Sequence, residues 1–298
     1  QWKQLRDYAA GCGVRILGDM PIFVAHHSAE VWANRELFYL DPAGEPHVVA
    51  GVPPDYFSAT GQRWGNPLYD WDRHRATGFA WWIERLRASD SQVDRVRIDH
   101  FRAFESYWEI PATEPTAIGG KWVVGPGREL FDALEAALGD VDVVAEDLGV
   151  ITPAVEALRD GLAIPGMTVL QFAFGGDPEN AYLPHNHRRN QVAYTGTHDN
   201  DTTRGWFDGL TDAEQHHVRT YLAVDGGDVA WDVIRAAWRS VADLAVAPIQ
   251  DVFAFGSERR MNTPGGAAGN WGFRLQDAPP DHLADRLRGL TELYGRVV

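Results

Sequence analysis

Polar residues end several short apolar runs of the sequence, and their types suit acid–base chemistry. They are Asp19, Asp99 with the following His100, Glu146 with Asp147, and the THDNDT stretch of residues 197–202. In parallel α/β folds the strand ends on the carboxyl side meet at one edge, so these groups are expected to converge. Converging carboxylates repel each other. Such a cluster therefore suits either the binding of a metal ion or acid–base chemistry in which the carboxyl groups have separated pKa values.

The run that ends at Asp99 reads VDRVRID and includes Arg97. Residues two apart in a strand point to the same face, so Arg97 is expected beside Asp99. A guanidinium there keeps the carboxylate ionised and oriented, which suits a nucleophile. A purely structural Arg–Asp pair would have the same local sequence, and both interpretations stay open at this point.

Glu146 ends the run VDVVAE, so apolar neighbours precede it. A glutamate in such surroundings has a raised pKa and can donate a proton. The alternative is a solvated carboxylate that caps the next element. In the THDNDT stretch, His198 and Asp199 suit either a metal ion or the hydroxyl groups of a sugar. A single such stretch is weak evidence for a metal, and Asn200 and Asp201 are expected to make structural hydrogen bonds.

Strands and helices alternate along the chain, as in a doubly wound sheet or a (β/α)8 barrel. The helices predicted most clearly span residues 2–10, 129–138 and 153–161, and Thr211 with Glu214 forms a capping box. Buried parallel strands are predicted at 14–19, 93–99, 141–146, 167–172, 191–195 and 246–251. A barrel needs eight strands. We therefore expect a (β/α)8-type domain over residues 1–298 that lacks its first two β/α units.

Residues 38–73 are rich in proline, glycine and aromatic residues and fit none of these elements. A connection this long inside a compact domain is usually functional or disordered, and its aromatic residues argue against disorder. We expect an ordered lid over a site, within an insertion at about residues 26–92. The twelve tryptophans of the chain fit stacking on sugar rings, although most tryptophans lie in cores.

Composition narrows the possible functions. The 27 basic and 42 acidic residues give a net charge of −15, which argues against binding nucleic acid or an anionic membrane. The single cysteine, Cys12, excludes an internal disulfide and a CxxC zinc site. No apolar run is long enough to span a bilayer, and no signal-peptide pattern is present, so a cytoplasmic location is expected. Dinucleotide, phosphate-loop, nucleophile-elbow and HExxH motifs are absent.

Two or three strand-end carboxylates with aromatic residues and no cofactor motif suggest glycoside chemistry. From residue 13 to 271 the sequence resembles the 4-α-glucanotransferases of glycoside hydrolase family 77, the amylomaltases or disproportionating enzymes. The similar stretches are GDMPIFVA (18–25), GVPPDYFSATGQRWGNPLYDW (51–71), VRIDHFRAFESYWEIPA (96–112), VVAEDLGVITPAVEALRD (143–160), IPGMTVLQFAF (164–174), YTGTHDNDTT (194–203) and RRMNTPGGAAGNW (259–271).

The resemblance implies a role for each matching residue. Asp99 matches the nucleophile, Glu146 the general acid/base, and Asp199 the third carboxylate, which binds the sugar 2- and 3-hydroxyls. The expected substrate-binding residues are Asp19, Asp55, Tyr56, Gln62, Trp64, Arg97, His100, His198 and Asn270. No metal and no cofactor are expected.

The implied activity is retaining transfer of α-1,4-glucan segments between malto-oligosaccharides, with amylose or glycogen-type glucans as partners. The alternatives are an α-glucan hydrolase with the same carboxylates and an inactive glucan-binding fragment. Members of the family begin before the position of Gln1 and supply the first barrel strands there, so the N-terminal part is expected to be missing. The oligomeric state, monomer or homodimer, is not predicted.

Overall fold

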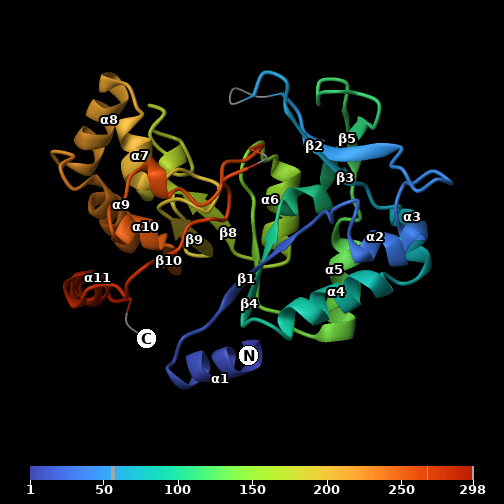
Figure 1. Cartoon of the computed structure of the whole chain (residues 1–298), viewed down its shortest axis with the longest axis horizontal. Coiled ribbons are helices and arrows are strands. Elements are labelled where there is room, and N and C mark those ends of the chain that lie inside the picture. The colour runs from blue at the N-terminus through green and yellow to red at the C-terminus, as the bar shows by residue number, and fades with distance from the viewer. Residues whose placement is uncertain (55–57, 267, 297–298) are drawn as a thin grey trace. The chain divides into compact units, whose positions relative to one another are not determined.

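The computed structural model describes residues 1–54, 58–266 and 268–296, which form two compact units of mixed α/β structure (Figure 1). Unit 1 comprises Gln1–Gly166 and unit 2 comprises Met167–Val298. Each unit has its own cluster of buried apolar side chains, one built around Trp82 and Phe101 and the other around Trp231 and Ile234. No helix of the described residues is long and apolar enough to cross a membrane.

Unit 1 contains a three-stranded parallel sheet with the strand order β1-β4-β7. Its strands are β1 (Leu17–Pro21), β4 (Arg95–Asp99) and β7 (Val143–Ala145). In the register, Asp19 lies opposite Arg97 and Ile98 lies opposite Ala145. The carboxyl ends of the three strands therefore lie together, and Glu146 follows β7 directly.

A second, four-stranded antiparallel sheet with the order β3-β2-β5-β6 belongs to the same unit. Its strands are β2 (Val48–Val52), β3 (Gln62–Pro67), β5 (Ser106–Pro111) and β6 (Lys121–Val124). From its composition, the segment of residues 38–73 was expected to be one long connection. It instead supplies two strands, β2 and β3. Gly51 allows the close pairing, because a Cβ there would lie 2.1 Å from the carbonyl oxygen of Gln62.

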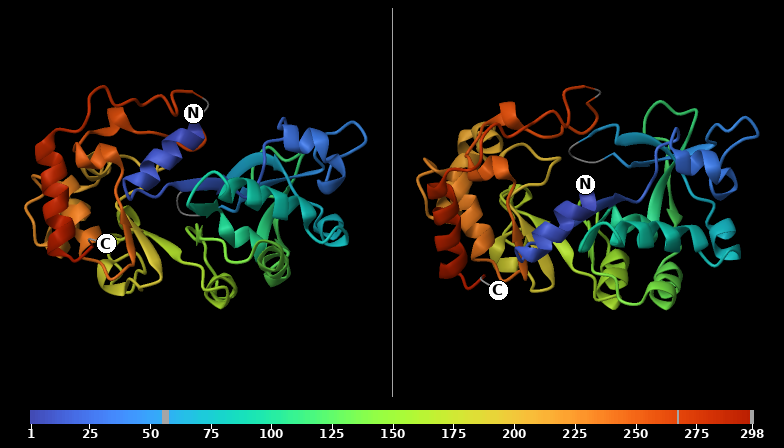
Figure 2. Two further views of the ribbon diagram at one scale, coloured as in Figure 1. Left: turned by 90° about the horizontal axis from the view of Figure 1, so that it is seen from below. Right: turned by 60° about the horizontal axis from the view of Figure 1, so that its bottom comes forward.

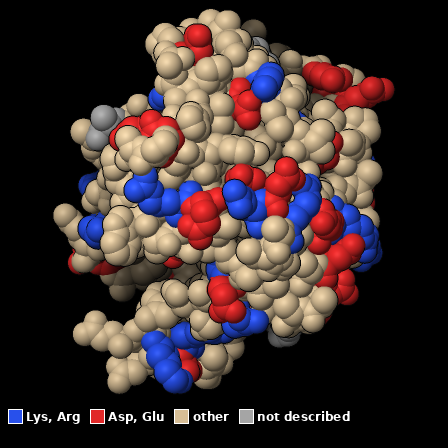
Figure 3. Space-filling view, turned by 90° about the vertical axis from the view of Figure 1, so that its right-hand side faces the viewer, with Lys and Arg blue, Asp and Glu red and all other residues tan. Residues whose placement is uncertain are grey.

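Helices follow the parallel strands along the chain. The helices of unit 1 are α1 (Trp2–Gly11), α2 (Ala29–Ala33), α3 (Trp71–Ala76), α4 (Ala80–Asp90), α5 (Arg128–Leu138) and α6 (Pro153–Gly161). Helix α4 packs against α5 and against β4, and Figure 2 shows α4 and α5 as neighbours. The side chain of Thr152 caps α6, and Pro153 is its first residue, as the sequence predicts. On the face drawn in Figure 3, basic and acidic side chains are interspersed.

Unit 2 contains a sheet with the order β10-β9-β8, in which β9 and β10 are parallel. Its strands are β8 (Gly166–Val169, which begins at the unit boundary), β9 (Gln191–Tyr194) and β10 (Leu244–Val246). Its helices are α7 (Thr203–Asp208), α8 (Asp212–Leu222), α9 (Val229–Trp238), α10 (Ile249–Val252) and α11 (Asp281–Leu293). The capping box of Thr211 and Glu214 is confirmed at the start of α8.

The prediction for residues 246–251 was largely wrong. Only Val246 belongs to a strand, because β10 ends there and α10 begins at Ile249. Pro248 fixes its own φ and carries no backbone N–H, so it suits the N-cap of a helix better than the interior of a strand. The other five predicted strands are present with shifted ends, and the last three residues of the run 167–172 form a 3₁₀ turn, η3 (Leu170–Phe172).

Candidate active site

The side chain of Arg97 joins two carboxylates at the carboxyl end of the parallel sheet in unit 1. Its Nη1 lies 2.6 Å from Asp19 Oδ1, and its Nη2 lies 2.9 Å from Asp99 Oδ1. The Arg97 side chain is 8% exposed, whereas each aspartate side chain is 41% exposed. Burial opposes the charge of Arg97, but Asp19, Asp99 and Glu146 raise the pKa of its guanidinium. Asp99 is therefore an oriented carboxylate that keeps contact with solvent.

Glu146 is buried beside this ion-pair network. Two backbone N–H groups donate to its carboxyl group: that of His100 to Oε2 at 2.7 Å and that of Leu148 to Oε1 at 2.9 Å. Burial, followed by the negative charge of Asp99, raises the pKa of Glu146 to about 7, while Arg97 and the two N–H donors oppose the rise. Near neutral pH this group exists in both protonation states, as a general acid that later acts as a base requires.

His100 connects Asp99 to Glu146 through its backbone. Its φ of 55° lies in the left-handed region, which is uncommon outside glycine and turns the chain directly after β4. The His100 imidazole is buried, and burial lowers its pKa to about 4. Within the described part of the chain, its Nε2 atom has no hydrogen-bond partner.

Two of the four residues predicted on the lid lie in the described structure near this site. Trp64, on β3, directs its ring edge-on to His100 with 4.8 Å between the ring centroids. The Gln62 side chain accepts a hydrogen bond from Trp64 Nε1 at 3.1 Å. Trp64 is 39% exposed, so part of its ring is available for a ligand. Asp55 and Tyr56 lie outside the described residues.

The third predicted carboxylate, Asp199, follows β9 in unit 2. Its Oδ2 atom lies 3.4 Å from Nε2 of His198, and its Oδ1 atom accepts a hydrogen bond from Asn262 Nδ2 at 2.5 Å. Arg260 Nη2 donates to the Asp199 backbone carbonyl at 2.6 Å. The Trp271 ring lies against His198, with 5.1 Å between the centroids. The side chain of Asp199 is therefore held on one side and 42% exposed.

Asn200 and Asp201 make structural hydrogen bonds, as the sequence predicted. Asn200 Oδ1 accepts from the backbone N–H and the hydroxyl of Thr197, each at 2.9 Å. Asp201 accepts from the Thr202 backbone N–H and from the Ser257 hydroxyl. The described residues contain no group of three or more histidine, cysteine, aspartate and glutamate side chains that could hold a metal ion.

Asn270 does not contact Asp199 in this structure. Its amide closes a turn, with Oδ1 accepting from the Thr263 N–H at 2.9 Å and Nδ2 donating to the carbonyls of Thr263 and Gly266. Sequence reasoning selected Asn270 and missed Asn262 and Arg260, although both lie at the start of the same stretch, RRMNTPGGAAGNW (259–271). A role of Asn270 in glucan binding stays a prediction.

Asp251 is a third residue that sequence reasoning missed. It is buried and accepts three hydrogen bonds: from the Thr195 hydroxyl at 2.6 Å, and from the Thr203 N–H and hydroxyl at 2.7 Å each. Thr195 precedes and Thr203 follows the loop that carries His198 and Asp199. Asp251 therefore fixes both ends of that loop, and its burial raises its pKa in spite of the three donors.

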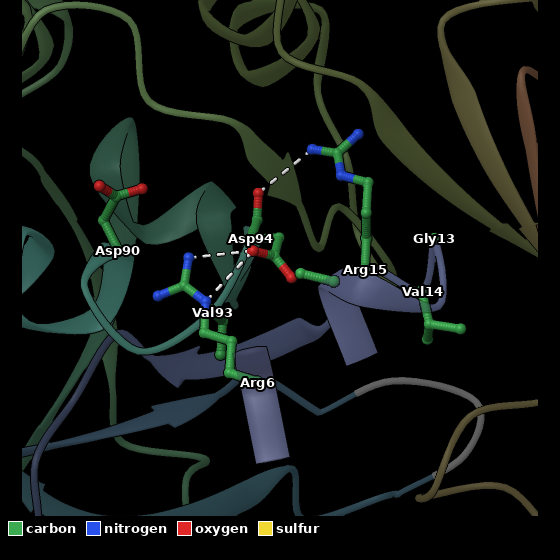
Figure 4. Close-up of a pocket in the computed structure, with 8 residues that line it drawn as sticks. Arg6, Gly13, Val14, Arg15, Asp90, Val93 and Asp94 are labelled. Carbon is green, nitrogen blue, oxygen red and sulfur yellow. Dashed lines mark hydrogen bonds and ion pairs between the residues drawn. The ribbon is translucent and has the colours of Figure 1, made fainter. Parts of the chain in front are cut away.

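A crevice of about 380 Å³ lies elsewhere in unit 1, at the amino ends of β1 and β4 (Figure 4). Its cationic groups are already paired, because Arg6 binds Asp94 at 2.9 Å and Arg15 binds Asp142 at 2.6 Å. The crevice is at the opposite end of the strands from Asp99 and contributes nothing to the site.

Parallel strands followed by helices, with a paired carboxylate and a buried carboxyl group at the strand ends, are typical of enzymes that act on glycosidic bonds. Comparison with known proteins identifies which family of such enzymes this chain belongs to. A family model for the 4-alpha-glucanotransferases, glycoside hydrolase family 77, matches residues 1–279, and the chain belongs to this family.

Individual relatives agree with this membership. The chain is 56% identical to a 4-alpha-glucanotransferase of Synechocystis, over 99% of this chain and 60% of that protein. It is 50% identical to a chloroplastic or amyloplastic 4-alpha-glucanotransferase of Arabidopsis thaliana, over 100% of this chain and 52% of that protein. The structure of amylomaltase from Streptococcus agalactiae in complex with acarbose matches with a TM-score of 0.95 at 38% identity, over 99% of this chain and 60% of that one. The chain thus spans between half and two thirds of the length of these relatives.

Proposed function

We propose that this chain carries the catalytic carboxylates of a 4-α-glucanotransferase, which moves α-1,4-glucan segments between malto-oligosaccharides. The observation that carries the proposal is the contrast between two neighbouring carboxyl groups. Asp99 is ion-paired with Arg97, whereas burial and the charge of Asp99 raise the pKa of Glu146 to about 7. An ionised nucleophile beside a protonated acid is the arrangement a retaining mechanism needs.

In the proposed first step, Asp99 attacks the anomeric carbon of the donor while Glu146 gives its proton to the leaving glycosidic oxygen. The bond between the sugar and the leaving glucan breaks, and a covalent β-glucosyl ester forms on Asp99. In the second step, the Glu146 carboxylate takes the proton of an acceptor 4-hydroxyl, which attacks the ester and restores an α-1,4 bond. Asp199 binds the sugar 2- and 3-hydroxyls, with His198 beside it.

The remaining predicted contacts belong to the same proposal. Asp19, Arg97 and His100 lie around the nucleophile, and Gln62 and Trp64 are proposed to contact the glucan from β3. Asp55 and Tyr56 are proposed as further glucan contacts on the basis of the sequence alone. Asn270 is included as a further glucan contact. The fold proposed for the enzyme is a (β/α)8 barrel, to which this chain contributes β1, β4, β7, β8, β9 and β10. Amylose and glycogen-type glucans are the proposed polymeric substrates, no metal or cofactor takes part, and the proposed location is the cytoplasm.

Incubation of the chain with maltotriose, followed by chromatography of the products, tests the function. Glucose together with a ladder of longer glucans is the expected result. Release of new reducing ends without longer products would replace the proposal by hydrolysis, and unchanged maltotriose would contradict activity of this chain.

The variant Asp99→Asn should lower the rate of transfer by at least about a thousandfold, because an amide does not replace a carboxylate nucleophile. Asp132→Asn is the matched control, because Asp132 is an exposed carboxylate on α5. Retention of activity by Asp99→Asn would refute the role of Asp99. Calorimetric binding of maltoheptaose by an inactive chain would identify a glucan-binding fragment.

A further inference from the structure

Arg102 is a buried cation whose contacts the proposed mechanism leaves unused. It lies in the 3₁₀ turn η2 (Phe101–Phe104), which starts two residues after Asp99, and it is 3% exposed. A buried guanidinium is usually paired with a carboxylate, because burial of an unpaired charge is costly. Across residues 1–54, 58–266 and 268–296, Arg102 forms no ion pair with a carboxylate.

The guanidinium of Arg102 donates instead to two other segments. It donates to the backbone carbonyl of Val150, to the carbonyl of Ser106 at 3.4 Å and to the hydroxyl of Ser106 at 2.9 Å. It also lies over the Trp122 ring, 3.8 Å from the ring centroid. One planar group thus connects η2 to β5, to β6 and to the loop that contains Val150.

That loop, residues 147–152, is the one that leaves Glu146. Its first residue, Asp147, is held by the buried Arg159. Its second residue, Leu148, donates its N–H to Glu146 Oε1 at 2.9 Å. Val150 is 51% exposed, so its own side chain packs weakly, whereas the next residue, Ile151, packs against the apolar core of unit 1. The hydrogen bond from Arg102 fixes the backbone of the loop at Val150.

The turn that carries Arg102 also holds Glu146 from the other side. The His100 N–H donates to Glu146 Oε2 at 2.7 Å, and the Phe101 N–H donates to the Glu146 backbone carbonyl at 2.9 Å. One oxygen of the carboxyl group is therefore bound by the turn after β4 and the other by the loop after β7. Arg102 joins this turn to this loop.

We propose that Arg102 is a positioning residue that holds loop 147–150 against the turn after Asp99, so that both backbone N–H donors stay on Glu146. The inference rests on the proposed function in one respect, the assignment of Glu146 as general acid/base. Lysine cannot replace arginine here, since a single ammonium group does not span Val150 and Ser106 and does not stack as a plane on Trp122.

Amide hydrogen exchange tests the geometric part without any need for activity. In Arg102→Gln and Arg102→Lys, amides of residues 147–150 should exchange at least about tenfold faster, because loss of one charge-assisted hydrogen bond lowers the free energy of local opening by about 1.4 kcal/mol. Amides of α9 in unit 2 should not change. Ser106→Ala removes one acceptor of Arg102 and also the hydroxyl that donates to Glu105, but it keeps the bond from Arg102 to Val150. It should give a smaller increase, and it is the variant to measure if the Arg102 variants do not fold.

The pH profile of transfer tests the catalytic part. The charged groups that face Glu146 are Asp99 and Arg97 on β4, and none is altered in these variants. Water that enters beside a loosened loop reduces the burial of Glu146, which is the largest cause of its raised pKa, whereas loss of the Leu148 N–H, the smallest contribution, acts in the opposite direction. The alkaline limb of kcat should therefore move to lower pH. We expect kcat to fall about tenfold with KM nearly unchanged.

Arg128→Gln is the matched control. Arg128 also donates to a backbone carbonyl of another segment, that of Gly161 at 2.8 Å, but its side chain is 56% exposed and it binds the end of α6 and not loop 147–150. Folded Arg102 variants with unchanged exchange in residues 147–150 would overturn the proposal. Faster exchange with an unshifted alkaline limb would overturn the catalytic part of the proposal. If the unaltered chain catalyses no transfer, the proposed function is refuted, but the exchange rates still decide whether Arg102 holds the loop.

Discussion

The protonation of Glu146 makes a quantitative prediction about stability. Its pKa is raised from 4.5 to about 7, so between these values the unfolded chain has released a proton that the folded chain retains. The contribution of Glu146 to the free energy of unfolding is therefore fully present below pH 4.5 and is lost as pH rises through 7. A shift of this size corresponds to about 3 kcal/mol, because one pKa unit is worth about 1.4 kcal/mol.

The variant Glu146→Gln removes this dependence on pH. Glutamine keeps the shape of the side chain, but its amide N–H₂ faces the N–H of either His100 or Leu148, which costs about 1–2 kcal/mol. At pH 4.5 the variant should therefore be less stable than the unaltered chain by about 1–2 kcal/mol. At pH 8 the unaltered chain has lost about 3 kcal/mol, so the variant should be the more stable one by about 1–2 kcal/mol.

Urea denaturation at a series of pH values, followed by fluorescence of the buried tryptophans of unit 1, measures this difference. The sign of the difference in unfolding free energy should reverse between pH 4.5 and 8. Glu135→Gln, which alters an exposed glutamate on α5, controls for a general effect of one charge and should show no reversal. If the variant and the unaltered chain differ in unfolding free energy by the same amount at both pH values, the burial of an ionisable Glu146 does not cause the difference.

Two further predictions concern buried groups in the two units. Burial lowers the pKa of His74 to about 4, so the unfolded chain binds a proton first as pH falls below 6.5. The unaltered chain should then lose about 3 kcal/mol relative to His74→Leu between pH 6.5 and 4, and equal acid stability of the two proteins in urea denaturation would contradict this. In unit 2, Asp251→Ala leaves the donors of Thr195 and Thr203 without an acceptor and should destabilise the unit by about 3 kcal/mol. The measurement is urea denaturation beside the exposed control Asp277→Ala, and a loss below 1 kcal/mol would show that the two threonines find other partners.

The parts of the site that depend on local sequence could be predicted. The alternation within β4 places Arg97 and Asp99 on one face, and the predicted pair forms. The apolar run before Glu146 predicted a raised pKa, and the raised value has burial as its first cause. The catalytic roles of these residues stay predictions, because geometry alone does not test them.

Contacts between distant segments could not be predicted in the same way. The four-stranded sheet pairs β2 with the distant β5, where Gly51 lies opposite Trp108, and β3 has no regular alternation of apolar residues. The contact of Asn262 with Asp199 depends on the path of the chain between two residues that are 63 positions apart. Such pairings are set by tertiary packing, which a local pattern of residue types does not encode.

The two donors that bind the Glu146 carboxyl group are main-chain N–H groups, and this has a consequence for sequence variation. Replacing the side chain of Leu148 leaves its N–H in place, so many residues at this position preserve the hydrogen bond to Glu146. Proline is the exception, because it has no N–H to donate. At position 100 the left-handed backbone excludes β-branched residues and tolerates glycine or asparagine. The surroundings of the Glu146 carboxyl group are thus set by the path of the main chain, and most side-chain substitutions at position 148 leave its N–H donor in place.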